Sequence, residues 1–370
     1  MREPQSFTMP PRGALLGLPP RPDTPRQVLW AQGGLCRSAR PQPAKYSFYA
    51  PDFFLDTPQP WLLPEDPADL EGVQTLFAEE LIAQLAQDKD ALPPADARQW
   101  HGPKRSEFDQ DFGDLQAHFR AGKLRKAVPV FFEHADGPVS PAQTARWIAA
   151  SLHAPETLLP YGCWTERGGM LGASPEVLFE VRGGTLKTMA LAGTLAAPPR
   201  GAAEAEASFL ADPKERKEHN LVVEGIVDAL APLGAVTVGP TRILKLPGLW
   251  HLQTPIEAAL REDPQMENLV RRLHPTPALG GSPRDASLDW LRRQDLKAGE
   301  AERRGGFGAP FGVQSPDGSL FCVVAVRSLQ WDHKRMHIGA GCGIIQESRP
   351  EREWEELRRK RETVKRLLGI

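Results

Sequence analysis

Two segments carry pairs of glutamates spaced three residues apart, a pattern that could hold a cation. Glu215 and Glu218 lie in a helix predicted over residues 211–230, and they extend its apolar stripe toward the helix start. A carboxylate on the buried side of a helix is costly unless it is paired or binds a cation. Taken alone, the pair is better explained by the favourable position of acidic side chains near a helix N-terminus than by a ligand role.

The C-terminal segment repeats this spacing. Glu353, Glu356 and Lys360 lie along one edge of the apolar face of a helix predicted over residues 350–368. A solvated face with Glu–Lys pairs is the simpler interpretation of either helix alone. Two helices that each direct a glutamate pair toward a core edge favour a cation site. Mg²⁺ suits such a site because it prefers oxygen ligands and keeps several waters.

An arginine and a glycine run just before this helix could bind an anion. Residues 319–331 are predicted to be one buried strand interrupted by Arg327, whose guanidinium can bind a carboxylate through two hydrogen bonds. Residues 336–345 are predicted to run as a strand into a glycine loop, whose successive backbone N–H groups could bind an anion. With the glutamates, these features indicate a small acidic ligand bound together with a metal ion.

The elements that position these groups include a hairpin over residues 172–194. Gly183 and Gly184 form its turn, and Glu176 and Thr194 lie near its open end, so the hairpin should bring a carboxylate and a hydroxyl close together. Lys126 precedes a short apolar strand. Further helices are predicted over residues 66–88, 108–124 and 141–152.

Composition places the chain among globular enzymes. It has 370 residues, 41% hydrophobic and 25% charged, and a net charge of −2, so no overall field attracts nucleic acid or an anionic membrane. The four cysteines are widely spaced, which argues against disulfides or zinc and for a reducing compartment. No apolar run is long enough to span a membrane or to act as a signal peptide. We therefore expect a cytoplasmic protein without an obligatory protein partner, in which residues 1–60 form a Pro/Gly-rich lead-in packed on a catalytic domain over residues 61–370.

Taken together, the motifs resemble the chorismate-binding enzyme family, which includes isochorismate synthases, salicylate synthases and anthranilate synthase component I. The matching segments follow the family's order over residues 120–370: GASPEVLFEV, LAGT, DPKERKEHNLVVEGI, LWHLQTPIEAAL, LHPTPALGGSPRDAS, RGGFGAPFG, VAVRSL and IGAGCGIIQESRPEREWEELRRK. The resemblance implies an α/β (α+β) fold in one large unit, with antiparallel sheets in the centre and helices outside. It does not clearly cover the first hundred residues.

The resemblance also implies roles for individual residues. Glu218 and Glu356 would be the main Mg²⁺ ligands, with Glu215 and Glu353 supporting them through water. Lys126 would be the general base and Glu176 the general acid. The substrate chorismate would contact Gly193, Thr194, His251, Ala278, Leu279, Arg327, Gly341, Cys342, Gly343 and Lys360.

Three positions distinguish among members of the family. Ala192 occupies the place of the lysine nucleophile of similar aminodeoxychorismate synthases. Lys126 stands where anthranilate synthases usually have glutamine and where members that use water have a basic lysine. Ala278 and Leu279 differ from the Thr-x-Ser-Gly pattern of members that eliminate pyruvate. Because the strand after Lys126 departs from the family pattern, Lys123 remains an alternative base.

Within the resemblance, these positions imply an isochorismate synthase. Menaquinone biosynthesis is the expected pathway, and synthesis of a catechol siderophore or of salicylate is the alternative. Water would attack C2 of chorismate while the C4 hydroxyl leaves, so a base and an acid are both needed. Burial would favour the neutral amine of Lys126 and the protonated carboxyl of Glu176, leaving one group a base and the other an acid. The alternatives are a salicylate synthase, which would also release pyruvate, and a non-catalytic protein that binds chorismate.

Overall fold

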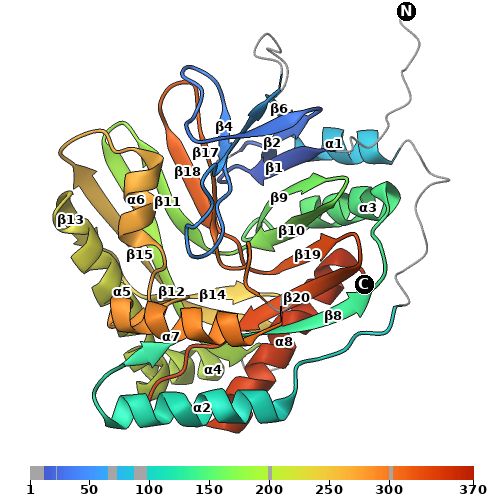
Figure 1. Ribbon diagram of the computed structural model, residues 1–370. Helices are drawn as coiled ribbons and strands as arrows, with labels where there is room; N and C mark the ends of the chain where they lie inside the picture. Colours follow the sequence, from blue (N-terminus) through green and yellow to red (C-terminus); the bar gives the residue numbers. More distant parts are fainter. Residues whose placement is uncertain (1–11, 22, 66–72, 87–97, 199–201, 300–302) are drawn as a thin grey trace, which may run out of the picture.

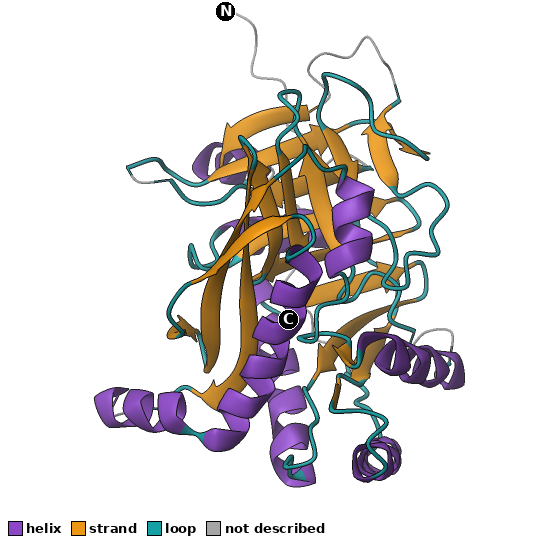
Figure 2. Ribbon diagram, turned by 90° about the vertical axis from the view of Figure 1, so that its left-hand side faces the viewer, coloured by secondary structure: helices purple, strands orange, loops and turns teal. Residues whose placement is uncertain are grey.

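Strands from two antiparallel sheets occupy the centre of the molecule, and the helices lie outside them (Figures 1 and 2). The computed structural model describes residues 12–21, 23–65, 73–86, 98–198, 202–299 and 303–370. The predicted fold class, a single α/β unit with central antiparallel sheets, is confirmed. Among the described residues, no helix has the length and apolar character needed to cross a bilayer.

The first sheet has eight strands, all paired antiparallel. In spatial order they are β6 (Val73–Phe77), β2 (Gln27–Gln32), β1 (Gly13–Gly17), β9 (Leu159–Thr165), β10 (Gly168–Ser174), β19 (Ser328–Asp332), β20 (Arg335–Gly341) and β8 (Val130–Asp136).

The second sheet has ten strands, and β14 (Arg242–Leu246) pairs with one of them outside the main order. The main order is β13 (Gly234–Val238), β15 (Leu249–Leu260), β12 (Thr185–Ala196), β11 (Val177–Arg182), β18 (Leu320–Val324), β17 (Pro310–Gln314), β4 (Ser47–Tyr49), β5 (Trp61–Pro64) and β3 (Leu35–Ser38). A short third pair joins β7 (Lys126–Ala127) and β16 (Gly281–Ser282).

Eight helices are described. They are α1 (Ala78–Leu85), α2 (Arg105–Arg120), α3 (Pro141–Leu152), α4 (Ala202–Ala211), α5 (Pro213–Leu230), α6 (Met266–Leu273), α7 (Arg284–Lys297) and α8 (Pro350–Leu368). The helices predicted over residues 141–152, 211–230 and 350–368 are confirmed, and α2 begins three residues before the predicted segment. Asp212 caps α5 by accepting hydrogen bonds from two backbone N–H groups of its first turn.

Two of the predicted elements were wrong. Within residues 66–88, the first seven lie outside the described residues, and Val73 and Phe77 belong to strand β6, so the helix begins only at Ala78. Residues 319–331 are two strands in different sheets, because the chain leaves the second sheet after Val324 and enters the first at Ser328. Both parts are buried, so the apolar run looks continuous in the sequence.

The described residues before position 60 contribute strands to both sheets. β1 lies between β2 and β9 in the first sheet, while β3 and β4 pair with β5 in the second. The predicted division into a lead-in over residues 1–60 and a catalytic domain over residues 61–370 stays a prediction.

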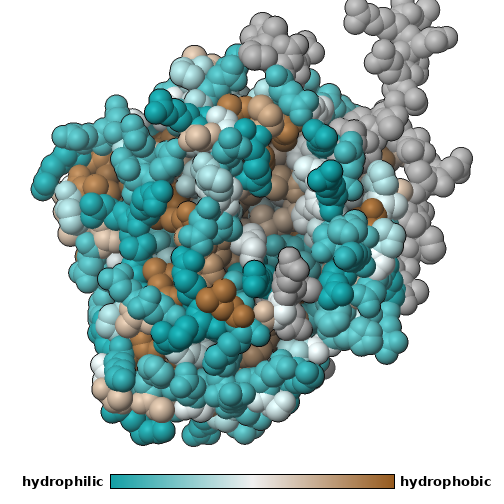
Figure 3. Space-filling model, in the orientation of Figure 1, coloured by the Kyte–Doolittle hydropathy of each residue, from teal (hydrophilic) through white to brown (hydrophobic). Residues whose placement is uncertain are grey.

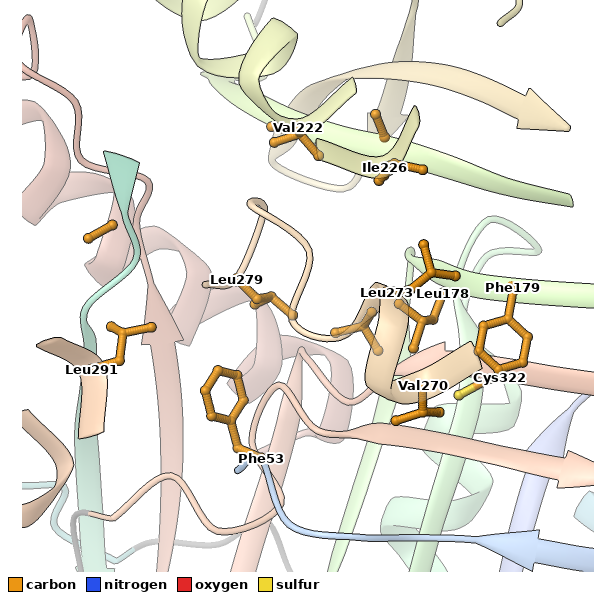
Figure 4. Close-up of a cluster of buried hydrophobic side chains, with 14 of the residues drawn as sticks. Phe53, Leu178, Phe179, Val222, Ile226, Val270, Leu273, Leu279, Leu291 and Cys322 are labelled. Carbon is orange, nitrogen blue, oxygen red and sulfur yellow. The ribbon is translucent and has the colours of Figure 1, made fainter. Parts of the chain in front are cut away.

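Buried side chains hold the layers together in several clusters. The largest joins α5 and α6 to the second sheet, where Val222 and Ile226 face Leu178 and Phe179, as Figure 4 shows. A further cluster fills the space between the sheets, with Leu16 from the first and Phe311 from the second. These apolar contacts fix the two sheets and α5 relative to one another, which is what the site requires.

Candidate active site

The chain crosses between the two sheets at two neighbouring points, and each crossing carries a polar residue predicted to function. Glu176 lies between β10 and β11, and Arg327 lies between β18 and β19. Hydrogen bonds join the crossings: the Val324 N–H donates to the Glu176 carbonyl at 3.0 Å, and the Ser174 hydroxyl donates to the Val324 carbonyl at 2.6 Å. Arg327 has φ +58°, a left-handed backbone that turns the chain from one sheet to the other.

The two crossings, at Glu176 and at Arg327, together form what we call the seam between the sheets. Glu176 is buried there, with 6% of its surface exposed. Burial raises the pKa of its carboxyl to about 7, while the charges of Lys126 and Lys360 act in the opposite direction. This agrees with the expectation that burial lets Glu176 hold a proton near neutral pH. Its role as general acid stays a prediction.

Lys126 is fully buried in β7 and forms an ion pair with Glu218 of α5, with 3.0 Å between Nζ and Oε1. Lys123, the alternative base, is exposed on the segment after α2. A small cavity, described below, lies at the seam. Lys126 does not line this cavity, but it lies directly behind Gly343, which does. A Cβ on Gly343 would lie 2.8 Å from Lys126 Cε. Of the two lysines, the structure therefore brings Lys126 to the site.

The four predicted metal-binding glutamates lie together where the first turns of α5 and α8 meet, and a lysine lies among them. The Lys214 ammonium is 3.2 Å from Glu215, 3.1 Å from Glu218 and 3.2 Å from Glu353. The fourth glutamate, Glu356, pairs with Lys360 at 2.6 Å. The sequence analysis missed Lys214, although its position four residues before Glu218 on one helix face predicts a side-chain pair.

These charges shift the pKa values of one another. Burial and the neighbouring carboxylates raise the pKa values of Glu215 and Glu353. Burial alone would raise the pKa of Glu218 too, but Lys126 and Lys214 outweigh it and lower that pKa. Burial alone would lower the pKa of Lys214, whereas the carboxylates around it raise the pKa above its ordinary value. The cluster therefore holds a cationic ammonium tightly.

The donor set fits Mg²⁺ in chemistry. The groups are carboxylates from two helices, and Glu353 is buried with its Oε2 atom lacking any hydrogen-bond partner. The cluster is already a cation site, since a lysine ammonium lies inside it. In the described part of the chain, no three histidine, cysteine or acidic side chains are grouped around one point as ready ligands. The carboxylates would have to close around the ion after Lys214 moves.

Arg327 is oriented by two partners from other elements. Its Nη2 donates to Nε2 of His251 at 3.0 Å, and its Nη1 donates to the hydroxyl of Thr363 at 2.5 Å. Burial, together with the charges of Arg327 and Lys360, lowers the pKa of His251 to about 3, so its ring is neutral. The other ring nitrogen, Nδ1, then donates to the Gly193 carbonyl at 3.0 Å. His251 was predicted to contact the substrate; it also orients the arginine.

Gly193 forms a bulge in β12 that carries this arrangement. Its φ of +72° shifts the register with β15 between Ala192 and Thr194. The bulge turns the Thr194 N–H to the Glu215 carboxylate at 2.9 Å and the Gly193 carbonyl to His251. The hairpin of residues 172–194 is therefore confirmed in its turn and strands, except that residues 172–174 belong to β10 and its second strand continues to Ala196.

The glycine run before α8 does not form an anion-binding loop. Gly339 and Gly341 lie within β20 and pair with β8, and none of the run's glycines has a positive φ. Their missing side chains instead make room, because a Cβ on Gly343 would lie 2.1 Å from Glu218 Oε1. The Gly341 carbonyl accepts a hydrogen bond from Lys360 at 2.7 Å. Cys342 is buried in the core and is not among the residues that line the cavity, so its predicted substrate contact stays a prediction.

These groups surround a cavity of about 80 Å³ at the seam. The predicted site residues that line it are Glu176, Gly193, Thr194, Glu218, His251, Ala278, Leu279, Arg327, Gly341, Gly343, Glu356 and Lys360. Val128, Leu191, Phe307 and Val326, which were not predicted, add apolar wall. Such a mixture of basic groups, a carboxyl with a raised pKa and apolar wall suits a small acidic ring compound.

A larger groove of about 1240 Å³ lies elsewhere, between α5 and α6, and holds none of the predicted site residues. One of its arginines, Arg284, is used within the protein, where it donates to the carbonyls of Arg271 and His274. In the orientation of Figure 3 the surface is mostly hydrophilic, with hydrophobic side chains in separate patches. The seam cavity remains the candidate active site because the charged and buried groups converge there.

Comparisons with known proteins bear on the family of this chain. A salicylate biosynthesis isochorismate synthase of Pseudomonas aeruginosa is 34% identical over 283 residues, covering 74% of this chain and 57% of that protein. Isochorismate synthase MenF of Bacillus subtilis is 34% identical over 314 residues, covering 82% of this chain and 63% of that protein. The chain thus spans less than two thirds of the length of these relatives.

Among solved structures, MenF, the menaquinone-specific isochorismate synthase from Escherichia coli, superposes with a TM-score of 0.77 at 23% identity, covering 98% of this chain and 90% of that one. This likeness shows the fold. The family model described as "Chorismate binding enzyme" matches residues 70–369, which include the whole glutamate cluster and both sheet crossings. The chain therefore belongs to the chorismate binding enzyme family.

Proposed function

We propose that this protein is an isochorismate synthase that converts chorismate to isochorismate with the help of Mg²⁺. The observation that carries the proposal is Glu176, a buried carboxyl with a pKa near 7 that lines the same cavity as Arg327 and two of the clustered glutamates. Relatives that carry the isochorismate synthase name support it. We assign the product to menaquinone biosynthesis because the chain is similar to MenF proteins.

The reaction exchanges one hydroxyl for another. A water molecule adds to C2 of the ring, the double bonds shift, and the C4 hydroxyl departs. Glu176 gives its proton to the departing hydroxyl, which leaves as water. Lys126 accepts the proton of the attacking water, which requires that its ammonium, paired with Glu218, first gives up a proton. One water enters and one leaves, so the product is an isomer of the substrate.

Other residues of the chain bind and orient the substrate. The Arg327 guanidinium, held by His251 and Thr363, would bind one carboxylate through two hydrogen bonds. Lys360 lies at the cavity wall beside Glu356 and supplies a second positive charge. Mg²⁺ held by Glu218 and Glu356, with support from Glu215 and Glu353, would neutralise the charge of a substrate carboxylate.

The test is incubation of the purified protein with chorismate and Mg²⁺, with the products separated by chromatography and pyruvate assayed in the same tube. We expect isochorismate without pyruvate, and loss of product when EDTA is added. Lys126→Met should lower turnover by about 10²-fold or more, whereas Lys123→Met, which removes an exposed amine, should not.

Two results would contradict the proposal. Salicylate together with pyruvate would identify a salicylate synthase and would mean that Ala278 and Leu279 do not exclude elimination. Saturable binding of chorismate without any turnover, in a folded protein, would identify a non-catalytic binder.

A further inference from the structure

Lys214 occupies the centre of the glutamate cluster. It lies in the first turn of α5, and its ammonium is within 3.2 Å of one carboxylate oxygen from each of Glu215, Glu218 and Glu353. These carboxylates come from two helices that are far apart in the sequence. The lysine therefore links the start of α5 to the start of α8 through charge.

The ammonium and a divalent cation cannot share this place. Both would need the same carboxylate oxygens, and like charges a few ångströms apart repel strongly in a partly buried site. Without a cation among them, these carboxylates would be close, partly buried and mutually repulsive. A metal ion held by Glu218, with Glu353 supporting it through water, must therefore replace Lys214 rather than add to it.

Lys214 borders a groove into which its side chain could move. The side chain is 22% exposed, so it is not sealed in the core. The groove, of about 1020 Å³, lies between α5 and the start of α8. Glu347, Glu351 and Glu355 line the same groove. Each already pairs with another basic side chain, so the ammonium would enter an acidic groove without replacing those pairs.

We propose that Lys214 is an internal cation of the glutamate cluster, which holds α5 and α8 together in the metal-free protein and moves into the neighbouring groove when a divalent cation binds. Lys214 thereby lowers the affinity of the cluster for the metal. In the metal-free protein, it offsets the repulsion among the glutamate carboxylates. The displacement of Lys214 by a metal rests on the proposed Mg²⁺ requirement. Its role in holding α5 and α8 together in the metal-free protein does not.

The experiment follows Lys214 directly. The holoprotein and the metal-free protein are treated briefly with an amine-acetylating reagent, and the labelled peptides are measured by mass spectrometry. Because the amine leaves three carboxylates for an open groove, Mg²⁺ should increase labelling of Lys214 several-fold. Lys217, which pairs with Glu347 at 2.5 Å on the next turn, is the internal control and should label equally in both states. Unchanged or reduced labelling of Lys214 would overturn the displacement.

Two variants complete the test. Lys214→Met removes the charge and keeps the length, and Lys214→Gln keeps a hydrogen-bond donor in case the first variant does not fold. Each should lower the melting temperature of the metal-free protein and bind Mg²⁺ roughly tenfold more tightly in calorimetry. Lys217→Met, the matched control, should do neither.

The outcomes separate the two proposals. Equal Mg²⁺ affinity in wild type and the Lys214 variants would overturn the role of Lys214 while leaving the metal site intact. An absence of Mg²⁺ binding in all of these proteins would contradict the metal site itself. In that case, a melting temperature that is unchanged by Lys214→Met would also overturn the role of Lys214 in stabilising the metal-free protein.

Discussion

Lys126 Nζ lies 3.0 Å from Glu218 Oε1. The absence of a side chain on Gly343 leaves room for this contact. The proposed base therefore contacts a proposed metal ligand. Both side chains are buried, so the pair is shielded from solvent, and breaking it would leave an uncompensated buried charge. This contact joins the acid–base chemistry to the cation site.

A methyl group at Gly343 should disrupt this contact. The Cβ of Gly343→Ala would lie 2.1 Å from Glu218 Oε1, so the carboxylate and the lysine must separate. We expect turnover to fall at least about tenfold and unfolding free energy to fall by about 1–3 kcal/mol. Urea unfolding and product chromatography measure the two effects.

Gly113 offers the matched control. It is exposed within α2, and a Cβ there meets no atom within 4 Å, so Gly113→Ala should be neutral or stabilise the protein by about 0.5–1 kcal/mol without changing turnover. Wild-type activity in Gly343→Ala would show that the Lys126–Glu218 contact is not needed.

The pH dependence of the reaction should report Glu176. Burial raises the pKa of its carboxyl to about 7, so the proton is present below this pH and is lost above it. Because the proposed role requires the proton, kcat/KM should fall by about tenfold per pH unit on the alkaline side. Glu176→Gln cannot titrate and should lose both the activity and this limb of the profile. A profile that stays flat up to pH 9 would exclude Glu176 as the acid.

Thr363 should act on substrate binding through Arg327. Thr363→Val removes the hydroxyl that accepts the hydrogen bond of Nη1 at 2.5 Å, leaving the guanidinium held by His251 alone. Loss of one hydrogen bond to a charged group corresponds to about 1.5–3 kcal/mol, so KM should rise roughly 10- to 100-fold with a smaller change in kcat. Thr363→Ser keeps the hydroxyl and should restore KM. Equal defects in both variants would mean that the methyl group matters instead.

Acid should destabilise the protein through His274. Its Nε2 donates to the Phe53 carbonyl at 2.8 Å, and its Nδ1 is buried without a partner, so a second proton would have no acceptor. Burial therefore lowers the pKa of His274 to about 4, below the value of 6.5 for a free histidine. The unfolded chain binds more protons between these values, so stability is complete above pH 6.5 and is lost as the pH falls toward 4.

The full loss corresponds to about 3 kcal/mol. Urea unfolding of wild type and His274→Gln from pH 7.5 to 4.5 measures it, and the difference between the two curves isolates this residue from other buried histidines. Parallel curves would show that His274 does not titrate in this way.

The glutamate pairs were predictable from the sequence because helical periodicity is local. Residues three and four apart share a face whatever the rest of the chain does, so Glu215 with Glu218 and Glu353 with Glu356 could be placed on core edges, and the helices that carry them were confirmed. Gly183 and Gly184 likewise marked a hairpin turn through their backbone freedom. The order of the motifs along the chain was enough to indicate the family.

Only the tertiary structure decided how distant segments meet. Both sheets are buried, so an apolar run does not reveal that the chain changes sheets at Arg327 or that β1 lies inside the first sheet. Strand pairing, and the contact of Lys126 with Glu218 across 92 residues, depend on packing that no local pattern encodes. The position of Lys214 follows the same rule: the sequence predicts its pair with Glu218, but only the tertiary structure brings Glu353 of α8 within reach of it.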